Sequence, residues 1–236
     1  MNLVLLEDMD FIEPSRVVVT GERFLHVKKI IRAEVGSTLA CGKVNGKVGT
    51  GRVISMNRNG FEMEVDLNIE PPPPLALTLV LALPRPKMLK RILQSVTSLG
   101  VKEIYLINSW RVEKSFWLSD LLETERLERH LKLGLAQAKD TRMPVVTLKR
   151  YFTAFAKEEL PDLGKNKMRI LAHPKTSQAC PAGVNKEAVL VIGPEGGFID
   201  QEVDTLTAAG FFPYTIGPRI LRVETAVTAL ISRLYT

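Results

Sequence analysis

The sequence predicts an α/β protein with a largely parallel sheet, preceded by a small β-barrel. Three observations support this prediction. Four consecutive prolines at 71–74 divide the 236-residue chain, short β-favouring runs with glycine turns precede them, and alternating strand and helix patterns follow them. We therefore expect a first domain at 1–70, a stiff proline linker at 71–74 and a second domain at 75–236.

The first domain is expected to consist mainly of strands. β-Favouring runs occur at 16–20, 38–41, 47–55 and 61–67, with glycines between or beside them. Residues 61–67 alternate apolar and acidic side chains, as a half-buried strand does. One basic helix, at about 22–32, interrupts the set.

The second domain alternates the two patterns. Continuous apolar runs such as 77–83 are typical of parallel strands that are buried on both faces. Further strands are expected at 104–107, 145–148, 168–172 and 188–192. Helices are expected at 88–99, 118–138, 201–209 and 224–234. This alternation predicts a parallel sheet covered by helices.

Composition and charge are those of a soluble protein that binds a polyanion. The net charge is +6 and the pI is about 9.3. Residues 14–61 hold 9 Lys/Arg against 2 Asp/Glu, and residues 84–150 hold 14 against 7. These two basic blocks indicate an extended surface for a phosphate backbone; the alternative is that the lysines only keep the protein solvated.

Several classes of protein are disfavoured. No apolar run is long enough for a membrane helix, and the acidic N-terminus does not resemble a secretory signal. The two cysteines, Cys41 and Cys180, are far apart and have no neighbouring histidines. We therefore expect a cytoplasmic protein without a disulfide framework, a structural metal or a membrane partner.

The strongest candidate for a ligand site is the glycine-rich segment after Ile192. The run Gly193-Pro194-Glu195-Gly196-Gly197 follows a predicted buried strand, at the end where open α/β sheets bind ligands. A carboxylate stands where a phosphate site would have a cation, and no P-loop lysine follows. This favours a nucleotide without phosphate, such as S-adenosylmethionine. We expect Asp200 to cap the next helix; the alternative reading of the segment is a plain tight turn.

A second strand–loop–helix pattern spans 214–226. Gly217-Pro218 marks a turn, and Arg219 and Arg222 bring two permanent cations to the same region. Thr225, Ala226 and Ala229 form a small-residue face on the last helix, against which another backbone can pack closely.

These motifs together resemble those of a known family. Gly193-Pro194-Glu195-Gly196-Gly197-Phe198, then Glu202, Gly210, Gly217 and residues 220–226, resemble the signature of the RsmE family. These SPOUT-superfamily enzymes methylate N3 of a uridine in small-subunit ribosomal RNA. The basic helix from His26 to Arg32 and the run Leu99-Gly100-Val101 resemble further elements of the family, so the likeness extends over most of the chain.

The resemblance implies a PUA-like β-barrel followed by a SPOUT domain with a C-terminal trefoil knot, S-adenosylmethionine as cofactor, and a homodimer built around the last helix. It implies a cofactor site on three loops, comprising Leu171, Ala172, His173, Ile192, Gly193, Glu195, Gly196, Gly197, Ile216, Gly217, Ile220 and Leu221.

Catalysis is assigned to two residues of the last motif. Methylation of N3 requires loss of the imide proton, and a fixed guanidinium would stabilise the resulting charge. Arg222 is the candidate for this role, with Glu224 orienting it or acting as the base. The alternative is an Arg222–Glu224 ion pair with a purely structural role.

RNA contacts are expected mainly from the basic residues of the first domain. The candidates are Arg16, Arg23, His26, Lys28, Lys29, Arg32 and, from the second domain, Arg219. The chain departs from the family pattern at Ser95, Ser98, Ala136 and Asp140. Two alternative functions remain open at this point, a ribose 2′-O methyltransferase of the same superfamily and a non-catalytic RNA-binding protein.

Overall fold

The structure is a computed structural model that describes residues 2–184 and 186–235. The contacts divide the chain into two compact units. Unit 1 comprises Met1–Pro73 and Lys132–Met143, and unit 2 comprises Pro74–Leu131 and Pro144–Thr236.

Unit 1 is built on a six-stranded mixed sheet in the order β1-β4-β5-β6-β3-β2. β1 pairs with β4 in parallel, and the other pairs are antiparallel. The strands are β1 (Val4–Leu6), β2 (Phe11–Glu13), β3 (Arg16–Thr20), β4 (Thr38–Lys43), β5 (Val48–Met56) and β6 (Gly60–Ile69). The predicted strands are all present, whereas β1 and β2 were not anticipated because each has only three residues.

One face of this sheet is closed by the basic helix. Val17 and Val19 of β3 alternate inward and pack with Phe24, Phe61 and Met63. The single helix expected at 22–32 is instead the α-helix α1 (Gly21–His26) followed by the π-helix η2 (Val27–Ile31). Arg32 ends it in the left-handed conformation, with φ 58°. A 3₁₀ turn, η1 (Asp8–Asp10), joins β1 to β2.

The second segment of unit 1, residues 132–143, contains the end of helix α3. Leu135 and Ala136 pack with Leu3 and Leu5 in a small apolar cluster. The Ala136 carbonyl accepts from the backbone N–H of Asn2 (3.0 Å). A segment that lies far along the sequence is therefore part of the N-terminal unit.

Unit 2 is built on a six-stranded sheet in the order β12-β10-β11-β7-β8-β9, and every pair is parallel. The strands are β7 (Leu77–Ala82), β8 (Glu103–Ile107), β9 (Val145–Lys149), β10 (Met168–Ala172), β11 (Ala188–Ile192) and β12 (Phe212–Tyr214). All residues of β7 and β11, at the centre of the sheet, are buried. The predicted fold class, an α/β protein with a parallel C-terminal sheet, is confirmed at this level.

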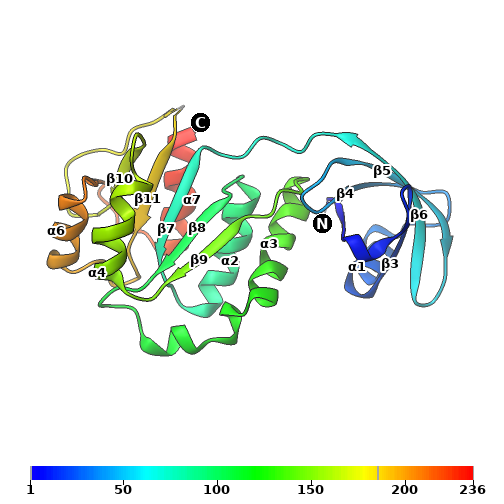
Figure 1. Cartoon of the computed structure of the whole chain (residues 1–236), viewed down its shortest axis with the longest axis horizontal. Coiled ribbons are helices and arrows are strands. Elements are labelled where there is room, and N and C mark those ends of the chain that lie inside the picture. Colours follow the sequence, from blue (N-terminus) through cyan, green and yellow to red (C-terminus); the bar gives the residue numbers. More distant parts are fainter. Residues whose placement is uncertain (1, 185, 236) are drawn as a thin grey trace. The chain divides into compact units, whose positions relative to one another are not determined.

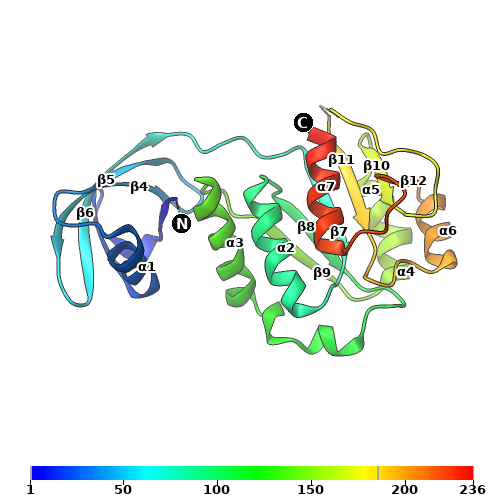
Figure 2. The ribbon, with the colours of Figure 1, turned by 180° about the vertical axis from the view of Figure 1, so that it is seen from behind.

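Helices cover both faces of the parallel sheet. Helices α2 and α7 pack together on one face (Figure 2), and α4, α5 and α6 lie on the other (Figure 1). The helices are α2 (Pro86–Ser98), α3 (Thr124–Ala138), α4 (Phe152–Ala154), α5 (Leu160–Leu163), α6 (Asp200–Ala208) and α7 (Val223–Tyr235), with short turns η3 (Lys114–Leu118), η4 (Asp120–Leu122) and η5 (Phe155–Glu159).

One predicted helix was wrong in extent, and one helical region was not predicted. α3 begins at Thr124 and not at 118, because the preceding residues form two 3₁₀ turns that bury Trp117 and Leu121. The helical turns of α4, η5 and α5 were not predicted, and they bury Phe155 and Leu160. In the part of the chain that the structure describes, no helix has the length and apolar character needed to cross a membrane.

Candidate functional site

The glycine-rich loop, residues 193–199, leaves the buried strand β11 at the carboxyl edge of the sheet. Gly197 has a φ of 72°, which L-residues with a side chain rarely adopt. A Cβ at Gly193 would lie 3.1 Å from the ring of Phe198. Glycine is therefore favoured at 197 by the backbone conformation and at 193 by close packing against Phe198.

The helix that follows this loop is capped by Glu202. The Glu202 carboxylate is buried, accepts from the Ile199 N–H (3.0 Å) through one oxygen and from the Trp110 N–H (2.8 Å) through the other. The predicted N-cap role of Asp200 was wrong, since Ile199 stands at the N-cap and Asp200 is the first helical residue. A glutamate at the third helical position can reach back to that N–H.

Two neighbouring loops hold the glycine-rich loop from the side. The Arg111 guanidinium donates to the Gly196 carbonyl. The backbone N–H of Arg85, after β7, donates to a carboxylate oxygen of Glu195 (3.1 Å). The loop is therefore fixed from the carboxyl ends of both β7 and β8.

The second loop of the site, residues 215–222, connects β12 to α7. The Thr215 hydroxyl donates to the Gly217 carbonyl (2.9 Å), and Gly217 has a φ of 141°. Beyond this turn the loop faces solvent: Ile220 is 87% exposed, and Arg219 and Arg222 are exposed as well.

A third segment, residues 173–184, wraps around the second loop. The His173 N–H donates to the Tyr214 carbonyl (2.9 Å), and the Thr215 N–H donates to the Gln178 carbonyl (2.9 Å). Ala179 and Thr215 also form a parallel bridge. The chain at 214–215 therefore lies between the end of β10 and residues 178–180. Farther on, the Val184 N–H bonds to the Leu234 carbonyl near the end of α7.

These three segments and the start of α7 enclose a cavity of about 280 Å³. Most of the residues predicted to bind a cofactor line it. They are Ala172, His173, Ile192, Gly193, Glu195, Gly196, Gly197, Ile216, Ile220 and Leu221. Leu171 and Gly217 are not in the lining; Leu171 is buried in β10. Arg219, predicted to contact RNA, also lines the cavity.

Other lining residues were missed by the sequence analysis. They are Pro174, Lys175, Pro194, Phe198, Tyr214, Thr215, Val223, Ala226 and Leu230. The residues of α7 lie on the inward face of an amphipathic helix, which a sequence pattern assigns to the core. Pro174 and Lys175 closely follow a predicted parallel strand. Since ligands bind at the carboxyl ends of such strands, this position could have identified them as cavity residues.

The charges around the cavity are mixed. Glu195 is the carboxylate of the lining, and Lys175 and Arg219 are its cations. Burial lowers the pKa of His173, the positive charge of Lys175 lowers it further, and Asp200 opposes the shift. The imidazole is therefore neutral at pH 7 and has one N–H to donate.

The two residues assigned to catalysis lie at the start of α7. The Arg222 side chain is exposed and Glu224 is half-buried, and neither is in the cavity lining. The Arg222 carbonyl accepts from the Ala226 N–H (2.8 Å), which fixes its backbone on the helix. Among the described residues, no ion pair joins Arg222 to Glu224. The alternative interpretation, an ion pair with a purely structural role, therefore has no support in this structure.

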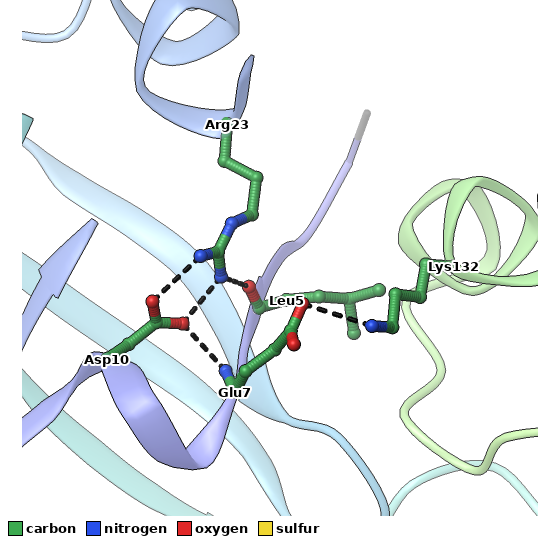
Figure 3. A network of polar contacts seen from close by, with 5 residues as sticks. All are labelled: Leu5, Glu7, Asp10, Arg23 and Lys132. Carbon is green, nitrogen blue, oxygen red and sulfur yellow. Dashed lines mark hydrogen bonds and ion pairs between the residues drawn. The ribbon is translucent and has the colours of Figure 1, made fainter. Parts of the chain in front are cut away.

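Among the RNA-contact candidates of unit 1, Arg23 has a structural use (Figure 3). Its guanidinium makes a bidentate ion pair with the buried Asp10 (2.5 and 2.7 Å) and donates to the Leu5 carbonyl (2.7 Å). Asp10 also accepts from the Glu7 N–H (2.7 Å), and the Glu7 carboxylate pairs with Lys132 of α3 (3.1 Å). The charge of Arg23 is thus balanced within unit 1 by Asp10.

Arg16 is also matched, since it pairs with Glu62 and Glu13. The other candidates of this unit are more open: Lys28, Lys29 and Arg32 are exposed and His26 is half-buried. The Lys28 ammonium lies 5.3 Å from the centre of the Phe24 ring. These four residues form the part of the predicted RNA surface whose side chains are most available.

The departures from the family pattern have local explanations in part. Ala136 is buried in the apolar cluster with Leu3 and Leu5, where a charged side chain would not fit. Asp140 is buried too, and its carboxylate accepts from the Arg142 N–H (2.9 Å). On α2, the Ser98 hydroxyl donates to the Gln94 carbonyl (2.8 Å), and Ser95 is exposed.

Comparisons with known proteins agree with this geometry. A sequence model described as an RNA methyltransferase domain matches residues 71–235. The chain is 31% identical to ribosomal RNA small subunit methyltransferase E of Treponema pallidum, over 97% of this chain and 88% of that protein. It is 30% identical to methyltransferase E 1 of Borreliella burgdorferi, over 61% and 60% of the two chains.

Solved structures share the fold over nearly the whole chain. Ribosomal RNA small subunit methyltransferase E from Neisseria gonorrhoeae, bound to S-adenosyl methionine, superposes with a TM-score of 0.72 at 21% identity, covering 98% of this chain and 96% of that one. A protein from Legionella pneumophila in complex with the bound cofactor SAM superposes with a TM-score of 0.77 at 22% identity, covering 99% of this chain and 96% of that one.

Proposed function

Because the chain belongs to the RNA methyltransferase family that includes ribosomal RNA small subunit methyltransferase E, we propose that it transfers a methyl group from S-adenosylmethionine to N3 of a uridine in small-subunit ribosomal RNA. One observation carries the proposal: two strand–loop–helix units and the 173–184 segment converge on one cavity at the carboxyl edge of a parallel sheet.

The cavity residues fit a nucleoside cofactor that lacks phosphate. The glycine-rich loop brings backbone close to the cavity at Gly193, Gly196 and Gly197, which suits a flat ring. Ile192, Ile220 and Leu221 supply apolar surface, and Glu195 adds a negative charge. We assign the adenosine and methionine parts of the cofactor to this set as a whole. When bound, S-adenosylmethionine supplies the methyl group from its sulfonium centre.

A trefoil knot is part of the proposal. Its support is the hydrogen-bonded passage of residues 214–215 between the end of β10 and residues 178–180, followed by α7. Such threading is rare in proteins. It would also fix the three segments of the cavity relative to one another.

The chemistry requires the uridine N3 proton to leave and the negative charge on the ring to be stabilised. We propose that Arg222 provides the stabilising guanidinium near a ring carbonyl oxygen. Glu224, half-buried on the first turn of α7, is the candidate for accepting the proton. The exposure of Arg222 supports a role that is completed when RNA is present.

The partners follow from the exposed charges. His26, Lys28, Lys29 and Arg32 are proposed to contact the phosphate backbone, which makes residues 1–70 an RNA-binding domain of PUA-like type and 75–236 the methyltransferase domain. A homodimer is proposed through α7, where Thr225 and Thr228 are exposed and Ala229 is half-buried.

The test uses purified protein and small ribosomal subunits, or their RNA, from a strain lacking this chain. We expect one S-adenosylmethionine bound per protomer and one methyl group transferred, located on a uridine base by nuclease digestion and mass spectrometry. A methyl group on a ribose would replace the proposal by 2′-O methylation. Absence of cofactor binding would replace it by RNA binding alone.

Arg222→Ala tests the catalytic assignment separately. We expect methyl transfer to fall by about 100-fold or more while the affinity for S-adenosylmethionine changes by less than about twofold, because Arg222 lies outside the cavity lining. Lys165→Ala, which removes an exposed cation at the opposite edge of the sheet, is the control. Unchanged transfer by the Arg222 variant would remove this residue from the mechanism.

A further inference from the structure

Trp110 is an exposed tryptophan beside the glycine-rich loop. It lies just after β8, and 79% of its surface is exposed. The only other tryptophan of the chain, Trp117, is 8% exposed, and its indole N–H donates to the side-chain oxygen of Asn108 (2.9 Å). Tryptophan is usually largely buried, so Trp110 contributes little to packing and is free for another role.

The backbone that carries this ring is held firmly. The Trp110 N–H donates to the buried carboxylate of Glu202 (2.8 Å), the same group that caps α6 after the glycine-rich loop. Next in the chain, Arg111 donates to the carbonyl of Gly196, which lines the cavity. The ring is therefore presented from a fixed position next to the cofactor loop, and fixing a recognition group in advance reduces the entropy lost on binding.

The residues that follow Trp110 include two exposed cations, and a second exposed aromatic ring follows the neighbouring strand. Arg111 and Lys114 are exposed, with Glu113 between them. Tyr151, 80% exposed, follows β9, and β9 pairs with β8 so that both chains end at the same edge of the sheet. Aromatic rings among arginines and lysines are the composition with which proteins bind unpaired nucleic acid, because bases stack on the rings while cations meet the phosphates.

We propose that the indole of Trp110 stacks on an unpaired base of the RNA substrate, beside the methyl-transfer cavity. The inference rests on the proposed function and deepens it, since it names single-stranded RNA as the substrate class at this site. A base within a duplex has both faces covered and its N3 paired, so it must leave the stack before chemistry on it. The exposed cations Arg111 and Lys114 that follow the ring in the chain favour RNA over a protein partner, which would be expected at a larger apolar surface.

The experiment measures binding of a labelled, unstructured, uridine-containing RNA to the full-length protein. Trp110→Ala is expected to weaken binding about tenfold, the size of one lost base–aromatic stack. Trp110→Phe keeps a ring and should stay within about twofold of wild type. Phe212→Ala removes an exposed aromatic ring at the opposite end of the sheet and should have no effect. Affinity for S-adenosylmethionine should be the same in all variants.

Fluorescence gives an independent readout. Adding this RNA should quench tryptophan emission of the wild type, whereas the Trp110→Phe variant, which still binds, should keep the emission of buried Trp117.

Duplex RNA is the control for stacking on an unpaired base. The same RNA annealed to its complement should bind wild type and Trp110→Ala with equal affinity.

Three results would overturn the inference. They are equal weakening by Ala and Phe, equal RNA affinity of Trp110→Ala and wild type with the same oligomeric state, and equal RNA affinity with a changed oligomeric state, which would assign the ring to a second copy of the chain. Failure of the proposed function is seen separately, as absence of methyl transfer by the wild type.

Discussion

Two loops face the same cavity but are held in very different ways. The glycine-rich loop is fixed by Glu202, Arg111 and the backbone of Arg85. In the 215–222 loop, the turn at Thr215 and Gly217 is fixed, but Ile220 beyond it is 87% exposed. One wall of the cavity is therefore preorganised, and part of the other is open to solvent.

This difference divides the work of the site. A fixed wall with glycines recognises a ligand at low entropic cost. The exposed apolar and cationic side chains of the other loop are available for contact with a substrate or a second protomer. Under the proposed function, the glycine-rich loop makes most of the contacts with the cofactor. Arg219, Ile220 and Arg222 complete the site when RNA binds.

Glu202→Ala is expected to have the largest effect on the fixed wall. The substitution removes the buried carboxylate that accepts from the partly buried N–H groups of Ile199 and Trp110. We expect the free energy of unfolding to fall by about 2–4 kcal/mol, measured by urea denaturation. Glu158→Ala removes an exposed glutamate from η5 and should change it by less than about 0.5 kcal/mol. Equal effects of the two variants would contradict the fixed-wall description.

Gly197→Ala tests the backbone of the same loop. The φ of 72° is costly for alanine, and a Cβ there would meet nothing within 4 Å, so the penalty comes from the backbone alone. We expect the left-handed conformation to cost alanine about 1 kcal/mol more than glycine. If the loop relaxes to another conformation to avoid this cost, calorimetry should show about fivefold weaker binding of S-adenosylmethionine.

Gly21→Ala is the matched control for that variant. Gly21 has a φ of 65° and is equally free of neighbours, but it lies at the start of α1 in unit 1. It should lower stability by a similar amount and leave cofactor affinity unchanged. Unchanged affinity in both variants would show that the glycine-rich loop does not need its left-handed residue to bind the cofactor.

The elements that the sequence predicted most closely are those with unambiguous apolar patterns. β3, β10 and β11 have the predicted bounds, because alternation or a continuous apolar run marks both ends. The start of α3 was predicted too early, since residues 114–122 have helical composition but use 3₁₀ turns to bury Trp117 and Leu121. That choice depends on tertiary packing.

The site was predictable where it depends on strand ends and not where it depends on three-dimensional context. Ala172 and Ile192 line the cavity as expected, whereas Leu171 points into the sheet core. Asp200 was the better N-cap by residue type, yet Ile199 stands at the N-cap, and the side-chain acceptor is Glu202 at the third helical position, which also accepts from Trp110, 92 residues earlier in the chain. The return of residues 132–143 to unit 1 has no sequence pattern of its own.

Ile220→Ser tests the open wall of the cavity and should have a smaller effect on stability than Glu202→Ala or Gly197→Ala. Because the side chain is 87% exposed, the free energy of unfolding should change by less than about 0.5 kcal/mol. Ile220 also lines the cavity, so the affinity for S-adenosylmethionine should fall by roughly threefold as apolar contact is lost. A loss of stability as large as that of Glu202→Ala would mean that the 215–222 loop is part of the rigid frame.

The smallest expected effect concerns His173, which lines the cavity beside both loops. Burial and the charge of Lys175 lower its pKa below the ordinary value of 6.5, so the folded state binds fewer protons at this site than the unfolded state in that pH range. The contribution of neutral His173 to the free energy of unfolding is thus fully present above pH 6.5 and is lost as the pH falls through the lowered pKa.

Burial also lowers the pKa values of His26 and His130, so the contribution of His173 must be isolated as a difference. The unfolding free energy of the wild type relative to that of His173→Asn, measured from about pH 7.5 to about pH 5, should decrease as the pH falls, because the variant lacks the group that takes up the proton on unfolding. A constant difference across this range would mean that His173 keeps an ordinary pKa. The opposing charge of Asp200 would then balance the effects of burial and Lys175 on this side of the cavity.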